Sequence, residues 1–218
     1  MKLIPIMIFL GLSISLCNLA EKLKGNKNDS GNANSSSSNS NAGKYDKGGM
    51  PAADKPEPTA AQTAAIAGGQ SVSWGKQAIT WTVPAKWSEV SNSNEMLNWK
   101  SPGSWDAAFL ISNISALGAD FPTDVSIKAT YDGAVTDQKN GKYEEVRWLE
   151  LDGIRGVLTR ETPQESKDSP RRLQWRGYRK YAGQTQLVSV MLSSQSQHFD
   201  MHKDAMYGVL YSSKLVHE

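Results

Sequence analysis

Two histidines near the C-terminus have a spacing that could bind a metal ion. His198 and His202 are four residues apart, so in a helix both imidazoles would lie on one face. A zinc-protease motif would place Glu directly after the first histidine, where this chain has Phe199. His217 follows fifteen residues after His202, and helical rise alone would separate the two by roughly 22 Å. The pair predicts a two-histidine metal site at most; we favour a solvated His198 and a His202 beside an apolar helix stripe.

Other catalytic groups are sparse or scattered. The sequence contains no Gly-x-Ser-x-Gly motif, and its one cysteine is Cys17. Five carboxylates could supply acid–base pairs: Glu144, Glu145, Glu150, Asp152 and Glu161. Because they are spread along predicted strands and a turn, a solvated sheet face is the favoured interpretation. We therefore expect no enzymatic activity and no cofactor; the alternative is a hydrolase or metal-dependent enzyme with a site near the C-terminal helix.

A basic stretch, RRLQWRGYRKY at residues 171–181, could bind an anion or a partner. If it is a strand, alternate side chains share one face, which places Arg172, Arg176 and Lys180 together with Gln174 and Tyr178. These three cations would form a strip for an acidic protein, a phospholipid or a wall polymer. The favoured alternative is cross-strand pairing with Glu144, Glu150 or Glu161.

The seven tryptophans all lie after residue 70, and several could stack on a sugar or another ligand; the candidates are Trp81, Trp99, Trp105, Trp148 and Trp175. Core packing is the favoured use for most of them. No internal repeat is present.

Hydrophobic periodicity predicts the elements that must position these side chains. Alternation predicts a strand at residues 79–83, and two more strands follow at 95–101 and 105–115. Three-or-four spacing predicts a helix over 123–139, capped by Thr123 or Asp124.

The C-terminal half reads as hairpins followed by a helix. Strands at 143–151 and 154–161 flank the turn Asp152-Gly153, and strands at 171–181 and 185–194 flank a second turn. A helix over 196–213 follows, with Ser196 as its cap. Hairpin-linked strands require an antiparallel sheet, so the fold class is α+β: a central antiparallel sheet with helices packed on its faces.

The order of these landmarks resembles the PsbP/Mog1-like domain family over about residues 71–216. The landmarks are TVPAKW at 82–87, the mid-chain helix, the Leu151-Asp152-Gly153 hairpin and VLYSSKLV at 209–216. The resemblance implies an antiparallel sheet with helices on both sides and an adaptor or assembly role, and it brings no catalytic residues.

The N-terminus predicts export. Residues 3–16 are uncharged and mostly apolar, too short to span a bilayer of roughly 30 Å but typical of a signal peptide, which we assign to residues 1–16. Ile14-Ser15-Leu16-Cys17 resembles a bacterial lipobox, although Leu16 departs from the small residue usually found there. We favour lipidation of Cys17 and a lipid-anchored envelope protein; cleavage after Ala20 and secretion is the alternative.

Residues 17–70 are rich in Ser, Asn, Gly and Pro, which predicts a disordered linker with a short helix possible at 59–67. Residues 71–218 then form one domain. In it ten Lys and seven Arg balance nine Asp and eight Glu, and this zero net charge argues against nucleic-acid binding. The expected partners are the bilayer, through acylated Cys17, and an envelope protein or wall component. A passive envelope protein without a small ligand is a third interpretation.

Overall fold

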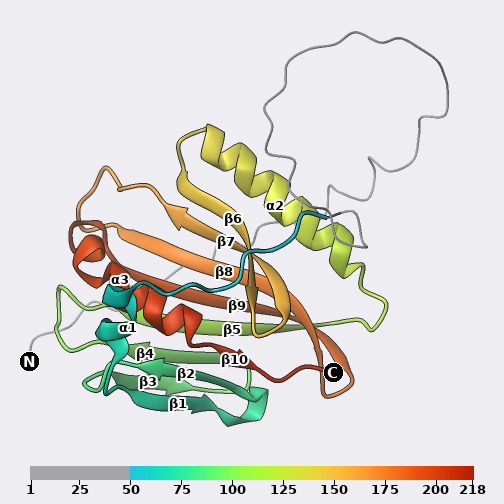
Figure 1. Cartoon of the computed structure of the whole chain (residues 1–218), viewed down its shortest axis with the longest axis horizontal. Coiled ribbons are helices and arrows are strands. Elements are labelled where there is room, and N and C mark those ends of the chain that lie inside the picture. Colours follow the sequence, from blue (N-terminus) through green and yellow to red (C-terminus); the bar gives the residue numbers. More distant parts are fainter. Residues whose placement is uncertain (1–49) are drawn as a thin grey trace, which may run out of the picture. The chain divides into compact units, whose positions relative to one another are not determined.

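The computed structural model describes residues 50–218 (Figure 1). The predicted signal peptide (1–16) and Cys17 lie outside the described residues. The helices are α1 (Ala60–Ile66), α2 (Thr123–Lys139) and α3 (Phe199–Tyr211), with single 3-10 turns η2 (Gly75–Gln77) and η3 (Ser196–His198). The strands are β1 (Gln70–Trp74), β2 (Ile79–Val83), β3 (Ser88–Asn92), β4 (Met96–Lys100), β5 (Phe109–Leu117), β6 (Tyr143–Leu151), β7 (Ile154–Glu161), β8 (Pro170–Tyr181), β9 (Gln184–Gln195) and β10 (Lys214–Leu215).

The strands form two antiparallel sheets. The larger has seven strands in the order β3-β4-β5-β9-β8-β7-β6, and the smaller has three in the order β1-β2-β10. The α+β class with a central antiparallel sheet is therefore confirmed. The sequence did not reveal the second sheet, in which the predicted strand at 79–83 lies and β10 brings the chain's C-terminal segment beside β2.

The main core lies between one face of the large sheet, helix α3 and the small sheet. Val188, Val190 and Leu192 of β9 are completely buried there, together with Phe199 and Leu210 of α3. In Figure 1, α1 lies beside α3 over this face. A close approach joins the two helices, because a Cβ at Gly208 would lie 2.6 Å from the Gln62 carbonyl oxygen.

Helix α2 covers a limited part of the opposite face. Its buried residues Ile127 and Ala134 pack with Trp148 of β6 and Val157 of β7. The Tyr131 ring stacks on Trp148 with 4.6 Å between ring centroids. This second cluster lies over β6 and β7, at one side of the seven-stranded sheet (Figure 1).

The segment before β1 belongs to the domain. Met50 is buried in the α2 cluster, and Asp54 forms a parallel bridge with Leu149 on edge strand β6. Helix α1, the possible short helix at 59–67, is confirmed, and a Thr59–Gln62 capping box begins it. The predicted linker of residues 17–70 is therefore wrong at its C-terminal end, because proline-rich composition hid the few contacts that hold this segment.

Both helix caps predicted from sequence differ from those observed. Pro122 occupies the cap position of α2 and makes no side-chain cap bond, while Thr123 and Asp124 lie in the first turn. Ser196 begins η3, and its hydroxyl accepts from the Gln164 backbone N–H at 2.9 Å. Proline and a tertiary contact thus replace the local caps that residue type suggested.

The indole of Trp175 sits across two strands above a pair of glycines. Gly156 of β7 and Gly177 of β8 are cross-strand partners, and an added Cβ on either would lie 2.3 Å or 2.5 Å from the Trp175 ring. The indole N–H donates to the Leu149 carbonyl of β6 at 2.9 Å. Trp175 thereby connects three strands and fixes the face that each residue of β8 occupies.

We predict that Gly156→Ala lowers the free energy of unfolding by about 1–3 kcal/mol, because the new methyl must displace a completely buried indole. Gly133→Ala is the matched control, since open space surrounds Gly133 in α2, and it should stabilise the protein by up to about 1 kcal/mol. Urea unfolding of both variants is the measurement; equal effects of the two substitutions would contradict the packing of Trp175.

Candidate functional site

Four adjacent strands of the large sheet, β8, β9, β5 and β4, present a face that α2 reaches only at the Tyr178 end of β8. On β8, alternation places Arg172, Gln174, Arg176, Tyr178 and Lys180 on this face, as the sequence predicted, while Leu173 and Trp175 point into the main core. Val157, which packs under α2, is the cross-strand partner of Arg176. The α2 cluster and the basic residues of β8 therefore share one side of the sheet.

Strand register extends this surface from β8 to β4. Gln174, Met191, Ile111 and Asn98 face one another in one row across the strands. Two flanking rows are Arg172, Ser193, Phe109 and Lys100, and Arg176, Ser189, Asn113 and Met96. We call these three rows, together with Lys180 on the same side of β8, the open face.

Burial differs sharply between the two sides of these strands. On the core side, Leu110, Val190 and Leu192 are completely buried. On the open face, Ile111 and Met191 are only partly buried, and Met96 is 39% exposed. The open face is therefore a solvent-facing sheet surface with apolar side chains at its centre.

The three predicted strip residues differ in their pairing. Arg172 pairs with Glu161 of β7 at 3.0 Å, which is one of the cross-strand pairs considered for the strip. Arg176 and Lys180 are exposed, and neither forms an ion pair within residues 50–218. Binding by the strip stays a prediction, with Arg176 and Lys180 as the available charges.

Two other arginines of β8 point the opposite way. Arg179 is buried and bonds to the carbonyls of Gln77 (2.6 Å) and Val216 (2.9 Å). Burial lowers the pKa of Arg179 to about 10, which leaves the guanidinium charged at neutral pH. Arg171 is also buried and lies over the Phe199 ring, 4.4 Å from its centroid. These inward arginines hold the two ends of β8 against the core.

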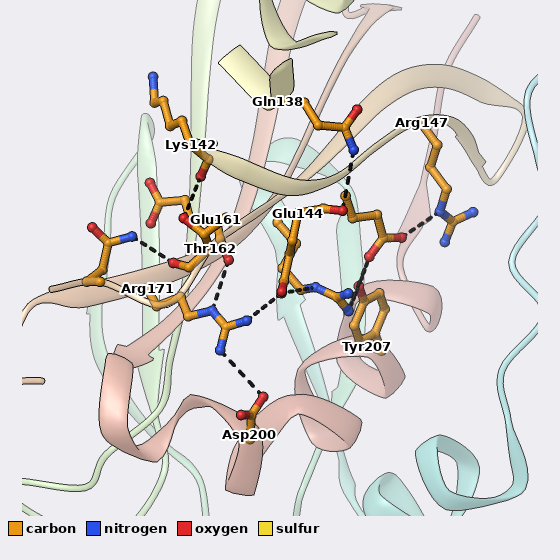
Figure 2. A network of polar contacts seen from close by, with 12 residues as sticks. Gln138, Lys142, Glu144, Arg147, Glu161, Thr162, Arg171, Asp200 and Tyr207 are labelled. Carbon is orange, nitrogen blue, oxygen red and sulfur yellow. Dashed lines mark hydrogen bonds and ion pairs between the residues drawn. The ribbon is translucent and has the colours of Figure 1, made fainter. Parts of the chain in front are cut away.

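A β-bulge gathers the predicted carboxylates beside Arg171. The register shifts between Tyr143 and Glu145, so the adjacent Glu144 and Glu145 both point to the α3 side. Arg160 lies 2.5 Å from Glu144 and 3.2 Å from Glu145. Figure 2 shows Arg171 between Glu144 and Asp200 of α3, with Arg171 bonded to the Glu161 carbonyl at 2.9 Å.

The same network reaches the N-terminal segment. Arg147 bonds to Glu145 (2.8 Å), to Asp54 (3.2 Å) and to the Tyr211 hydroxyl (2.6 Å). Three arginines therefore compensate the charges of Glu144 and Glu145. Of the other carboxylates, Asp152 accepts from the Leu215 N–H at 2.8 Å in the β6–β7 turn.

Tyr207 of α3 is buried within this network. Its hydroxyl donates to Glu145 and accepts from Arg160 at 2.7 Å (Figure 2). Burial, followed by the bond to Glu145, raises the pKa of Tyr207 far above that of a free phenol. Burial also raises the pKa of Tyr211, against the opposing effect of Arg147.

The histidine pair lies where η3 meets α3. The His202 Nε2 donates to the Asp106 carbonyl at 2.6 Å, so this nitrogen already has a partner. Residues 50–218 contain no group of three or more His, Cys, Asp or Glu side chains suited to a metal ion. The two-histidine metal site at His198 and His202 stays a prediction.

Most tryptophans serve the core, as favoured from sequence. Trp74, Trp81, Trp87, Trp148 and Trp175 are buried, and Trp99 is half-buried against the main cluster. Trp105 is the exception, with 81% of its surface exposed.

A cavity of about 220 Å³ lies between the start of α2, the β6–β7 turn and the C-terminal residues. Its charged lining mixes Asp124 and Glu218 with Arg155, Arg179 and Lys180, and Met50 and His217 also line it. Charges of both signs line the cavity, so they select no ligand class. No helix within residues 50–218 is long and apolar enough to cross a membrane.

Comparisons with known proteins bear on the fold alone. No family model matches the sequence, and no curated protein matches it. Among solved structures, the chain is similar to LpqN of Mycobacterium tuberculosis, described as involved in cell envelope biogenesis, at 13% identity and a TM-score of 0.49. The match covers 68% of this chain and 85% of LpqN.

Two further matches are proteins of the family that the sequence resembles. Cyanobacterial PsbP from Synechocystis matches at 16% identity and a TM-score of 0.43, over 67% of this chain and 92% of that one. The Ran-binding protein Mog1p of Saccharomyces cerevisiae matches at 11% identity and a TM-score of 0.35, over 68% and 96%. The chain spans less than half the length (46%) of a Bacteroides thetaiotaomicron protein that it also matches. At such TM-scores the likeness carries no argument about partners or activity.

We predict that the free energy of unfolding declines above about pH 10, the ordinary pKa of tyrosine. The folded pKa of Tyr207 lies above the unfolded one, so its contribution is complete below pH 10 and is lost as the unfolded chain ionises. Tyr207→Phe should cost about 1–2 kcal/mol at pH 7 and should flatten the alkaline decline. Urea unfolding from about pH 8 to about pH 11, which spans the ordinary titration of tyrosine, measures both effects. Parallel curves of unfolding free energy against pH for the wild type and Tyr207→Phe would contradict this role of Tyr207.

Proposed function

We propose that this protein is a bacterial envelope lipoprotein, tethered to a membrane through acylated Cys17, whose domain binds a protein partner and catalyses no reaction. The observation that carries the proposal is the open face, a surface of four strands with half-buried apolar side chains and exposed cations. Surfaces of this kind are used for docking, because their apolar centre gains from losing water and their charged rim selects the partner.

Charge selects an acidic protein as the partner of the open face. Arg176 and Lys180 are exposed, Lys100 is half-buried, and Arg172 keeps 41% of its side chain exposed beside Glu161. A second copy of this chain would bring the same cations together, and like charges across an interface cost several kcal/mol. A complementary acidic patch would instead speed association and fix the orientation of the partner.

Attachment to the membrane is supported by the sequence around Cys17. The apolar residues 3–16, the lipobox-like Ile14-Ser15-Leu16-Cys17 and the absence of any other cysteine fit lipidation at this position. Two or more acyl chains hold a protein stably on a bilayer, since each buried methylene contributes about 0.8 kcal/mol. The envelope localisation depends on this step.

The lipid anchor is tested by growing cells with an alkyne analogue of palmitate. We expect label on the wild-type protein, no label on Cys17→Ala, and transfer of the variant from the membrane to the soluble fraction. A labelled Cys17→Ala protein would contradict lipidation at this residue.

The open face is tested by photo-crosslinking in intact cells. A photoreactive residue replaces Met191 on the open face or, as a control, Lys86 beside the small sheet. We expect Met191 to give an adduct of one fixed mass and Lys86 to give none. Arg176→Glu/Lys180→Glu should lower the yield roughly tenfold or more, because it opposes an acidic partner.

The matched charge control is Lys76→Glu/Lys86→Glu, which makes the same change of charge on exposed residues that are not part of the open face. Equal loss of the adduct in both double variants would show a general effect of charge and would contradict the open face as the docking surface.

A further inference from the structure

A second surface lies at the tip of the β4–β5 connection. Trp105 is 81% exposed, the highest value among the exposed large apolar side chains of residues 50–218. The fold buries five of the other six tryptophans and half-buries Trp99. An indole exposed to water does not gain the free energy that burial of such a large apolar surface provides. The exposure of Trp105 therefore indicates a role other than stabilising the fold.

The loop that carries Trp105 is held on both sides. Ser101 and Ala108 close its base with two bonds, from the Ser101 N–H to the Ala108 carbonyl and from the Ala108 N–H to the Ser101 hydroxyl, both 2.8 Å long. Ala107 and Ala108 are buried, and the Asp106 carbonyl accepts from His202 at 2.6 Å. Gly103 has φ of +113°, and the Asp106 carboxylate packs where its Cβ would be. Trp105 therefore projects from a loop whose shape is already set.

A second apolar side chain belongs to the same region. Met201, 62% exposed, precedes the histidine of α3 that holds the loop. Acidic residues adjoin both in sequence: Asp106 follows Trp105, and Asp200, whose side chain is 75% exposed and also pairs with Arg171 at 3.5 Å, precedes Met201. We call Trp105, Asp106, Asp200 and Met201 the Trp105 tip.

We propose that the Trp105 tip is an anchor that inserts the indole into an apolar pocket, rimmed by basic residues, on a protein partner. This inference rests on the proposed protein-binding function and adds a contact separate from the open face. Tryptophan dominates binding energy where it fills a pocket on the partner. A preset loop loses little conformational entropy on binding, which strengthens such an anchor. The two adjoining carboxylates select a basic rim around the pocket.

Two features favour a protein over the bilayer. The carboxylates of Asp106 and Asp200 would be repelled by an anionic lipid surface. Met50, the first described residue, lines a cavity with Lys180. Lys100 and Phe109 flank the Trp105 loop, and both lie in the cross-strand row of Arg172. Arg172 and Lys180 are separated by eight residues of β8, or roughly 26 Å. The tip therefore lies at the end of the sheet opposite to Met50.

The experiment places a photoreactive residue at Ser104 of the full-length protein in intact cells, next to Trp105. We expect one adduct of fixed mass, lowered about tenfold or more by Trp105→Ala and largely kept by Trp105→Phe, because an aromatic ring still fills the pocket. Val125→Ala, which shortens a 69% exposed side chain on α2, is the matched control and should change nothing. Urea midpoints equal to that of the wild type show that the variants are folded.

Each other outcome contradicts the inference. An adduct at full yield in Trp105→Ala, an adduct with a second copy of the chain, or a lipid adduct would each exclude the protein pocket. So would quenching of wild-type tryptophan fluorescence, but not that of Trp105→Ala, by vesicles of brominated phosphatidylcholine and phosphatidylglycerol. An adduct from Met191 without one from Ser104 overturns the Trp105 anchor alone, whereas no adduct from either position overturns the proposed function as well.

Discussion

The indole of Trp175 occupies the space above Gly156 and Gly177, which only glycine leaves free because it has no side chain. Side chains alternate along a strand, so a slip of one residue would exchange the two faces of β8. With Trp175 locked over the glycine pair and bonded to Leu149, that slip is blocked. Arg172, Arg176 and Lys180 are therefore kept outward, and Arg171 and Arg179 are kept inward. A single packing arrangement thus determines which positive charges are available for binding.

The domain has no net charge, but its arginines fall into two groups: some pair with carboxylates inside the fold, and others face solvent. Arg147, Arg160 and Arg171 share Glu144 and Glu145, which the bulge in β6 turns to one side. This cluster also reaches Asp54 and helix α3, so it connects segments far apart in the chain. Breaking a buried pair costs several kcal/mol because the remaining charge has no water to solvate it. The inward arginines thus serve the fold, and the outward cations are left for the surface.

Periodicity gave the elements whose burial is regular along the chain. In β2, Ile79, Trp81 and Val83 are buried in strict alternation, and the predicted bounds of α2 and of the β6–β7 hairpin agree with those observed. Periodicity did not predict the short strands β1, β3 and β10, because their partners are distant in sequence or their side chains are mostly polar. The packing of residues 50–69 escaped because it depends on a few contacts, such as Met50 under α2 and Gly208 against Gln62.

The candidate surfaces were predictable to different degrees. Alternation alone placed Arg172, Arg176 and Lys180 on one face, since every strand follows that rule. That α2 lies over β6 and β7 and reaches β8 only at Tyr178, which leaves the open face uncovered, is a tertiary property that no local pattern carries. The exposure of Trp105 was equally hidden, although Pro102-Gly103 beside it marked a turn. The bulge at Glu144 had no sequence signal, so the grouping of the two carboxylates could not be foreseen.

The bridge between Asp54 and β6 determines how the domain would respond to mechanical force. Only two backbone bonds form it, from the Asp54 N–H to the Trp148 carbonyl and from the Glu150 N–H to the Asp54 carbonyl. In a chain anchored at Cys17, a pull from the membrane would act first on Met50 in the α2 cluster and then on this bridge, before the backbone of any strand. The bridge and then α1 would detach first, which lengthens the tether while the sheet stays folded. Unfolding of the segment before β1 would thus keep both proposed binding surfaces intact under force.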